Sequence, residues 1–458
     1  MRLGNLAVAS FDDKLAPVME AIVSPRPVDA ADFELSADAS RIHPDEVPGL
    51  TGLRFLAAFS VLFAHGVAVL LRGHDNPGSV AYWCTQASGF GMTLFFVLSG
   101  FVIHYNYANS VTAGRLRGIA AYLWARFARL YPLYLLTLVG YVLVSRRHFD
   151  FWFGDPAPFR DVLHALPYFL VSLQSWFYVP IGDTSLIYAV GGSTSVTWSI
   201  STEWFFYFTF PLVAWLVLRS RSPRGTAALI LAWCVLWIAL TTNLFDRAAG
   251  INAWAVEHYG SVAEMRQPRD DFAAQDSYVF WLLSFSPYFR MGEFVLGSLI
   301  AQLYMQLRDR KAGTLENALG TAAFVAAFIS VFVIGYFEFS PDVGTNVFRK
   351  MYMNFALAPS AAILVFCAAR YRNVLSRLLT SRPALLLGDA SYSIYLTHFL
   401  VLMVDFKLFG APGQRGNAFN VAVLGATIVA TLLLSIALYA YYEVPARKWL
   451  RQMWRDRV

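Results

Sequence analysis

The stretch from Leu50 to Leu71 reads LTGLRFLAAFSVLFAHGVAVLL and decides the class of fold. A helix that crosses the hydrocarbon core of a bilayer needs roughly 20 apolar residues, and the ionisable side chains in this stretch are Arg54 and His65. These two residues are eleven positions apart, which on an α-helix is roughly 16 Å and about three turns plus 20°. Both side chains therefore share one face of a predicted membrane helix.

Nine further apolar runs follow along the chain. They cover residues 87–105, 122–144, 196–218, 226–243, 279–305, 318–336, 355–371, 384–405 and 418–443. A run at 161–178 is weaker because it contains Asp161, His164, Pro167 and Gln174. We therefore predict an all-α polytopic membrane protein with about ten transmembrane helices and one interfacial or re-entrant helix.

The composition supports the same class. Of the 458 residues, 57% are hydrophobic and only 14% are charged, whereas a typical soluble domain is about 45–50% apolar and about a quarter charged. This balance excludes a soluble enzyme, a disordered regulator and a disulfide scaffold. The three cysteines are far apart in the sequence, so the sequence predicts neither a disulfide framework nor a metal site.

The net charge of +6 divides unevenly along the chain. Residues 1–49 carry nine acidic and four basic side chains, and the remainder is therefore strongly basic. We predict that 1–49 is an acidic, mostly disordered cytoplasmic tail, that 50–443 is the membrane domain, and that 444–458 is a basic cytoplasmic tail. The basic residues lie in short loops between apolar runs, so we expect no nucleic-acid partner.

The loop charges predict the topology. If the first helix begins on the inside and 161–178 is not a full crossing, the inner segments hold 19 Lys and Arg in about 73 residues. The outer segments hold 11 in about 131 residues. Cytoplasmic loops are enriched in Lys and Arg. We therefore expect ten crossings of the inner (cytoplasmic) membrane, with both termini cytoplasmic.

Ionisable side chains inside apolar runs are the functional candidates, because burying a charge in a membrane is expensive. His65 is the strongest of them. Arg126 and Arg129 are neighbours on one helix face and serve either as membrane anchors or as phosphate ligands. Glu203 is either a buried, satisfied acid or a group that binds or deprotonates a sugar hydroxyl.

Other polar residues of these runs have supporting or structural roles in our interpretation. Arg290 and Glu293, three residues apart, are predicted to form an internal ion pair. His398 is either a second site residue or a hydrogen-bonded packing residue. The candidates for contact with an acceptor or for supporting roles are Trp198, Ser199, Ser201, Tyr395 and His398.

Six motifs occur in a characteristic order. Arg54 and His65 are followed by FFVLSGFVI (95–103), RFARLYPLY (126–134), TWSISTEWFFYFTFP (197–211), RMGEFVLGSLIA (290–301) and LGDASYSIYLTHFLVL (387–402). This series resembles the integral-membrane acyltransferase-3 family, which acylates glycans, lipids and secondary metabolites. The resemblance implies transfer of an acyl group, most often acetyl, from cytoplasmic acyl-CoA to a hydroxyl.

The resemblance also implies roles for individual residues. His65 matches the family's catalytic histidine, as base or acyl carrier, and Glu203 matches its acid. Arg126 and Arg129 match the basic motif that holds the CoA phosphates, and Arg54 is expected to assist them. No bound cofactor is expected, since acyl-CoA is a substrate.

The expected partners are the lipid bilayer, acyl-CoA and a glycan such as an exopolysaccharide, an O-antigen or a lipid-linked sugar, with polysaccharide-assembly proteins as further candidates. The alternative hypothesis is a proton-coupled transporter or exporter of a lipid-linked sugar or small metabolite. In that case His65, Glu203 and His398 would form a proton relay. Transfer of label from acetyl-CoA to an acceptor separates the two hypotheses.

Overall fold

The computed structural model describes residues 47–74, 76–113, 116–145, 159–191, 196–264, 277–340, 342–351, 354–372, 374–410 and 416–455. The chain divides into two compact units, 1–47 and 48–458. The predicted acidic tail lies outside the described residues up to position 46.

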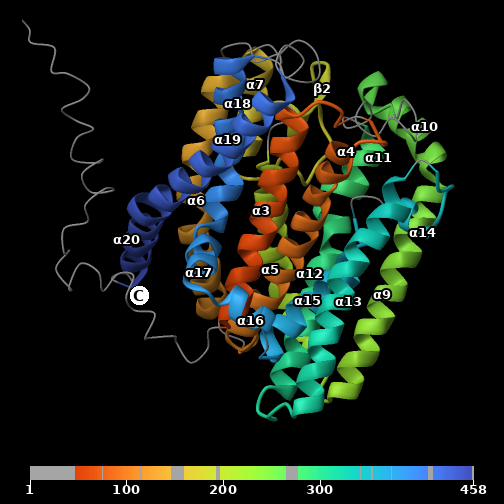
Figure 1. Cartoon of the computed structure of the whole chain (residues 1–458), viewed down its shortest axis with the longest axis vertical. Helices are drawn as coiled ribbons and strands as arrows, with labels where there is room; N and C mark the ends of the chain where they lie inside the picture. Colours follow the sequence, from red (N-terminus) through yellow and green to blue (C-terminus); the bar gives the residue numbers. More distant parts are fainter. Residues whose placement is uncertain are drawn as a thin grey trace, which may run out of the picture. The chain divides into compact units, whose positions relative to one another are not determined.

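The second unit is a bundle of helices (Figure 1). The long helices are α3 (Pro48–Leu70), α5 (Ala87–Thr112), α6 (Leu116–Ser145), α8 (Trp198–Val217), α9 (Pro223–Asp246), α12 (Pro287–Leu307), α13 (Thr314–Phe339), α15 (Ala358–Arg370), α18 (Ser391–Phe409) and α19 (Asn417–Leu438). The shorter ones are α4 (Val80–Thr85), α7 (Phe159–Leu170), α10 (Ala248–Tyr259), α11 (Tyr278–Phe280), α14 (Val347–Lys350), α16 (Val374–Leu379), α17 (Arg382–Asp389) and α20 (Val444–Arg455).

Short irregular elements connect these helices. Two are single turns of π-helix, η5 (Trp281–Phe285) and η7 (Tyr439–Glu443), which extend α11 and α19. The 3-10 turns are η2 (Leu186–Tyr188) and η4 (Ser261–Ala263). The strands β1 (Pro180–Ile181) and β2 (Thr184–Ser185) pair antiparallel, with Pro180 opposite Ser185.

Each of the ten predicted runs overlaps one of the long helices, although their ends differ by several residues. In the described part of the chain, seven helical segments are long and apolar enough to cross a membrane. Five of these segments are the single helices α3, α8, α9, α13 and α18. The other two are α4 joined to α5, and α19 together with the helical residues that follow it. These segments confirm the all-α membrane class. Helices suit a membrane because their backbone groups are hydrogen-bonded internally in lipid. The number of ten crossings and the side of the termini stay predictions.

Two contacts join loops that the charges predict to lie on the same side of the membrane. Gln306 donates a hydrogen bond of 2.8 Å to the backbone carbonyl of Ser220, which joins two segments predicted to lie inside. Lys350 forms an ion pair of 2.5 Å with Asp246, which joins two segments predicted to lie outside. Figure 1 shows α16 and α17 at one end of the bundle and α7, α10 and α11 at the other.

The centre of the bundle depends on small residues where α5 meets α12. Gly100 faces the backbone carbonyl of Phe294, and Gly297 faces that of Val97. A Cβ atom on either glycine would overlap the carbonyl of the facing helix. Close approach of backbones through small residues is the usual way in which membrane helices pack. The motifs FFVLSGFVI and RMGEFVLGSLIA thus form one interface.

The weak run at 161–178 folds back into the bundle. Its helix, α7, has 12 residues, about 18 Å, which is too short for a hydrocarbon core of about 30 Å. The hydroxyl of Tyr134, in the middle of α6, donates to the carbonyl of Phe169. The chain then turns, and the backbone N–H of Ser175 donates to Ser201 of α8 at 3.1 Å. Of the two predicted alternatives, this geometry favours the re-entrant one.

The segment after 443, predicted as a basic tail, forms the helix α20. It packs against α6, where the indole N–H of Trp124 donates to the carbonyl of Leu450 at 2.9 Å. The rings of Trp124 and Trp454 stack at 5.8 Å between centroids. These contacts give the C-terminal segment a fixed place beside the first turns of α6.

Candidate active site

A cavity of about 90 Å³ lies among α3, α5, α6, α8 and α18. Five of the sequence motifs contribute to it, although they are spread over more than 300 positions of the chain. The lining residues are Arg54, Met92, Phe95, Phe96, Leu98, Ser99, Val102, Ile103, Arg126, Arg129, Leu130, Ser199, Ile200, Glu203, Tyr207, Ser391, Tyr392 and Tyr395. The structure thus brings together most of the predicted site residues.

Three arginines line this cavity, Arg54 from α3 and Arg126 and Arg129 from α6. The guanidinium of Arg126 is buried, donates to the hydroxyl of Tyr107 at 2.8 Å and lies 4.8 Å from the centre of that ring. Its Nε has no hydrogen-bond partner among the residues that the structure describes. None of the ion pairs found among the described residues includes any of these three arginines. Their charges are therefore available to an anionic ligand.

Glu203 supplies the carboxylate of the cavity lining. The hydroxyl of Tyr207, one helical turn later on α8, donates to its Oε2 at 2.9 Å. Ser99 of α5 lines the same cavity, and Arg129 and Arg126 lie within electrostatic range of the carboxylate. The carboxylate is thus oriented by a hydroxyl group and faces the arginines. Sequence reasoning missed both Tyr207 and Ser99, although Ser99 lies in a motif that it had assigned to packing.

His65 lies farther along α3 and is not among the lining residues. Its Nδ1 is 2.9 Å from Nε2 of His398, and the two rings are nearly parallel, with 10° between their planes. The Nδ1 of His398 is 2.6 Å from the carbonyl oxygen of Tyr395. Phe399 packs on the His65 ring at 4.6 Å. His65 is therefore oriented by α18 through a second histidine.

The hydrogen bonds of this pair assign the positions of the protons when both rings are neutral. A backbone carbonyl only accepts, so Nδ1 of His398 carries a proton and its Nε2 is the acceptor. His65 consequently donates through Nδ1. Its Nε2 then holds the free lone pair, which is the form of imidazole that acts as a base or nucleophile.

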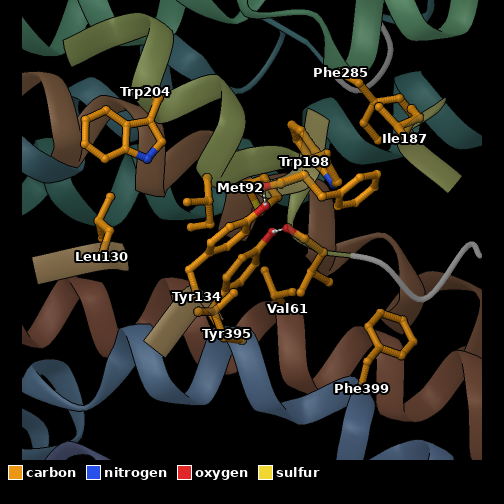
Figure 2. Packing of buried hydrophobic residues seen from close by; sticks show 14 of the residues in the cluster. Val61, Met92, Leu130, Tyr134, Ile187, Trp198, Trp204, Phe285, Tyr395 and Phe399 are labelled. Atoms are coloured by element: carbon orange, nitrogen blue, oxygen red, sulfur yellow. Dashed lines mark hydrogen bonds between the residues drawn. The ribbon is translucent and has the colours of Figure 1, made fainter. Parts of the chain in front are cut away.

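Tyr395 connects the cavity with the histidine pair. Its hydroxyl lines the cavity region, accepts a hydrogen bond of 2.8 Å from Ser199 and donates one of 2.9 Å to the carbonyl of Val196. Its backbone carbonyl holds His398, one turn farther along α18. Figure 2 shows the Tyr395 side chain in the same packed cluster as Val61, Met92 and Trp198.

Besides His398, two of the predicted acceptor or supporting residues lie outside the cavity lining. Trp198 packs edge-on against Phe285 at 4.8 Å between ring centroids. Ser201 is fully buried and is bonded to Ser175 of the re-entrant segment, with 2.9 Å between the two hydroxyls. Both residues therefore support the fold around the cavity.

Arg290 and Glu293 form an ion pair of 3.0 Å that is buried in α12. Arg290 also donates through Nε to the carbonyl of Ser284 at 2.7 Å, and Thr93 donates to the same Glu293 oxygen at 2.7 Å. Within the described part of the chain, the other carboxylate oxygen of Glu293 has no hydrogen-bond partner. The hydrogen bonds of the pair with Thr93 and Ser284 connect α12 to α5 and to η5.

A further acid that sequence reasoning left without a role, Glu443, lies near the cavity. It is buried at the end of η7 and accepts a hydrogen bond of 3.1 Å from Ser393 of α18. Arg129 and Arg447 lie within electrostatic range of its carboxylate. The signal in the sequence was an acidic residue at the end of an apolar run. Among the described residues, no group of three or more His, Cys, Asp or Glu side chains is arranged to hold a metal ion.

Comparison with known proteins identifies the family. The model of a family described as an acyltransferase domain matches residues 47–440, most of the chain. The chain belongs to the acyltransferase-3 family. It is therefore an acyltransferase, and the family match favours the transferase over the transporter that we considered from the sequence. No solved structure matches the chain.

Individual relatives support this assignment. The acyltransferase is 27% identical over 398 residues to acyltransferase MdmB of Streptomyces mycarofaciens, which covers 86% of this chain and 88% of MdmB. It is 25% identical to YrhL of Bacillus subtilis, a provisionally named peptidoglycan O-acetyltransferase, and 21% identical to O-acetyltransferase OatA of Staphylococcus aureus. Each of these matches covers 88% of this chain, but only 55% of YrhL and 58% of OatA.

Proposed function

We propose that this acyltransferase is a membrane O-acyltransferase that moves an acyl group, most readily acetyl, from acyl-CoA to a hydroxyl of a glycan or lipid-linked sugar. The observation that carries the proposal is the cavity lined by three arginines without ion-pair partners and connected through Tyr395 to the His65–His398 pair. Two of its relatives are named O-acetyltransferases, which supports an acetyl group and an oxygen acceptor.

The donor binds through its phosphates. Arginine recognises phosphate by bidentate, charge-assisted hydrogen bonds, and Arg126 has an unused, buried Nε for such a contact. The cavity is small, about 90 Å³, so we expect it to hold part of the acyl-pantetheine arm while the larger nucleotide stays outside it. Since acyl-CoA is a cytoplasmic metabolite, the nucleotide end faces the cytoplasm in an inner-membrane protein.

His65 performs the proton transfer. Its Nε2 takes the proton of the acceptor hydroxyl as the hydroxyl oxygen attacks the thioester carbonyl carbon. The carbon–sulfur bond breaks, the CoA thiolate leaves, and it takes up the proton from the imidazolium. Glu203, held by the hydroxyl of Tyr207, orients the acceptor or balances the charge of the arginines.

The acceptor approaches from the outer side of the membrane. The relative YrhL is provisionally named for peptidoglycan. An extracytoplasmic glycan or its lipid-linked precursor would likewise reach the enzyme from the outer side. Polysaccharide-assembly proteins are then natural partners, because they present such acceptors at the membrane surface.

Transfer of label tests the proposal. Purified protein in lipid nanodiscs receives radiolabelled acetyl-CoA together with lipid-linked sugar or peptidoglycan fragments, and the label on each acceptor is measured. We expect transfer by the wild type and a loss of about 10³-fold in His65→Ala, the usual scale of general-base catalysis. Asn243→Ala, on the exposed side of α9, is the matched control and should retain full activity. Undiminished transfer by His65→Ala would contradict the role of His65.

A further inference from the structure

Two hydroxyl groups of the cavity lining lie toward the histidine pair. They belong to Ser199 of α8 and Tyr395 of α18. Ser199 lies one helical turn before Glu203, and Tyr395 lies one turn before His398. The ring centroids of Tyr395 and His398 are 6.0 Å apart. The cavity therefore has one end at the arginines and Glu203 and another at Ser199 and Tyr395.

The hydrogen bonds of these two hydroxyls leave one proton free to turn. Tyr395 donates to the carbonyl of Val196 at 2.9 Å. The single proton of Ser199 has two acceptors within reach, the same carbonyl at 3.1 Å and the hydroxyl oxygen of Tyr395 at 2.8 Å. If the Ser199 proton turned to a bound ligand, Tyr395 and the carbonyl would still be bonded to each other. No buried polar group would then be left without a partner, which is the costly outcome.

Other hydroxyl groups of the cavity lining are held differently. Tyr207 donates to the carboxylate of Glu203 at 2.9 Å, and Tyr392 donates to a backbone carbonyl of α6 at 2.7 Å. Turning either proton away would cost that acceptor a hydrogen bond. Among the described residues, Ser199 is the lining serine that bonds to Tyr395. Ser199 thus combines a proton that is free to turn with a place near the histidine pair.

The proposed reaction creates a need for such a donor. When a sugar hydroxyl attacks the thioester carbon, the π electrons of the carbonyl group move to its oxygen, while His65 takes the hydroxyl proton. The electrons return when the carbon–sulfur bond breaks, and the CoA thiolate takes up the proton from the imidazolium. A hydrogen-bond donor fixed beside the oxygen stabilises its negative charge between these two events.

We propose that Ser199 donates a hydrogen bond to the thioester oxygen in the transition state, and that Tyr395 is the positioning residue that holds Ser199 in place. This inference rests on the proposed acyl transfer from acyl-CoA. The acyl carbonyl then lies between Ser199 and His65, and the O–H bond of Ser199 stays intact throughout. Ser201 has no such part, because it lies about 200° away on α8 and bonds to Ser175.

The first test removes the hydroxyl of Ser199. We expect Ser199→Ala to lower kcat about 10²-fold and to change the KM for acetyl-CoA less than about twofold, since the bond forms only in the transition state. Ser330→Ala in α13 is the matched control and should keep its activity. Like Ser199, Ser330 bonds to a carbonyl three residues back and to a hydroxyl of another helix, that of Ser360. The rates are measured with full-length protein in nanodiscs and with lipid-linked sugar and peptidoglycan fragments as acceptors.

A second donor separates a catalytic hydrogen bond from a structural role. In the dithioester analogue of acetyl-CoA, sulfur replaces the carbonyl oxygen and accepts hydrogen bonds poorly. Ser199→Ala should therefore cost about 10²-fold with acetyl-CoA but less than about threefold with the dithioester. Tyr395→Phe should lose about tenfold with acetyl-CoA, and again less with the dithioester. Because both donors are compared in one preparation, the ratio of the rates does not depend on the fraction of folded protein.

The same measurements show which idea fails. An equal loss with both donors makes Ser199 a structural residue and overturns its proposed role. Full activity of Ser199→Ala with acetyl-CoA overturns it as well, while acyl transfer by the wild type leaves the proposed function standing. Absence of transfer by the wild type would reject the acyl-CoA-dependent function, and the inference with it.

Discussion

The helices α3 and α9 are almost equal in length, with 23 and 24 residues, and both are apolar enough to cross a membrane. Their surroundings differ. In the most apolar window of α3, 61% of the residues are buried inside the bundle, compared with 11% for α9. Hydropathy therefore identifies both as membrane helices but does not distinguish a helix that builds the site from one that faces outward.

Side-chain size and polarity make this distinction. The buried face of α3 is rich in glycine and alanine, and the helix carries Arg54 and His65. The exposed face of α9 consists of bulky aliphatic residues such as Leu231, Val235 and Leu240. Small residues permit close packing between helices, whereas large apolar ones suit contact with lipid. In Figure 1, α9 and α13 lie at one edge of the bundle, away from α3 and α5.

Replacing a glycine by a larger residue should give the largest difference in stability between a buried and an outward-facing helix. Gly100→Leu in α5 would collide with the carbonyl of Phe294, and we expect a loss of folded protein, since overpacking against a backbone has no flexible side chain to displace. Gly335→Leu in α13 meets no atom within 4 Å and should be tolerated. Thermal unfolding in detergent measures both. Similar melting temperatures for the two variants would show that α5 and α13 do not differ in packing.

Removal of the second histidine should have the next largest effect. His398→Phe deletes the acceptor for Nδ1–H of His65, and we expect kcat to fall about 10²-fold with little change in the KM for the donor. His398→Asn retains an acceptor oxygen and should recover part of the loss. The control, His258→Phe, changes an exposed histidine of α10. If His398→Phe lowered the melting temperature and left kcat unchanged, His398 would be a packing residue.

The arginines should give the smallest of these effects. Arg126→Gln should raise the KM for acetyl-CoA about tenfold, the scale of one charge-assisted hydrogen bond to phosphate, with kcat changed much less. Arg219→Gln is the control, because Arg219 is exposed and stacks on Trp215 at 3.5 Å, outside the cavity lining. Steady-state kinetics at varied acetyl-CoA measure both variants. An equal KM for wild type and Arg126→Gln would remove Arg126 from the donor site.

The sequence predicted the helices and singled out Arg54, Arg126, Arg129 and Glu203 as candidate site residues, because periodicity and the cost of buried charge are local properties. It did not predict that Glu203 would line the same cavity as the three arginines. Nor did it predict that His65 would meet His398, which is 333 positions away. Such a contact depends on how helices pack, and a single sequence carries no direct record of it.

Two other differences were accessible to simple helical geometry. Ser199 and Ser201 are two positions apart, so they lie about 200° apart on α8. Only one of them could therefore line the cavity, and it is Ser199. The spacing of Leu450 and Trp454 in the C-terminal segment likewise predicts one apolar helix face, although we had interpreted that segment as a tail.

The orientation of the histidine pair comes from the main-chain carbonyl of residue 395, a group that every amino acid carries. The side chain at this position, by contrast, shapes the cavity. In evolutionary terms, the proposed function implies that selection can alter the fit to a donor or acceptor by changing this side chain, while Nε2 of His65 keeps its direction. The proposed substrate choice and chemistry would thus be inherited through separate parts of one residue.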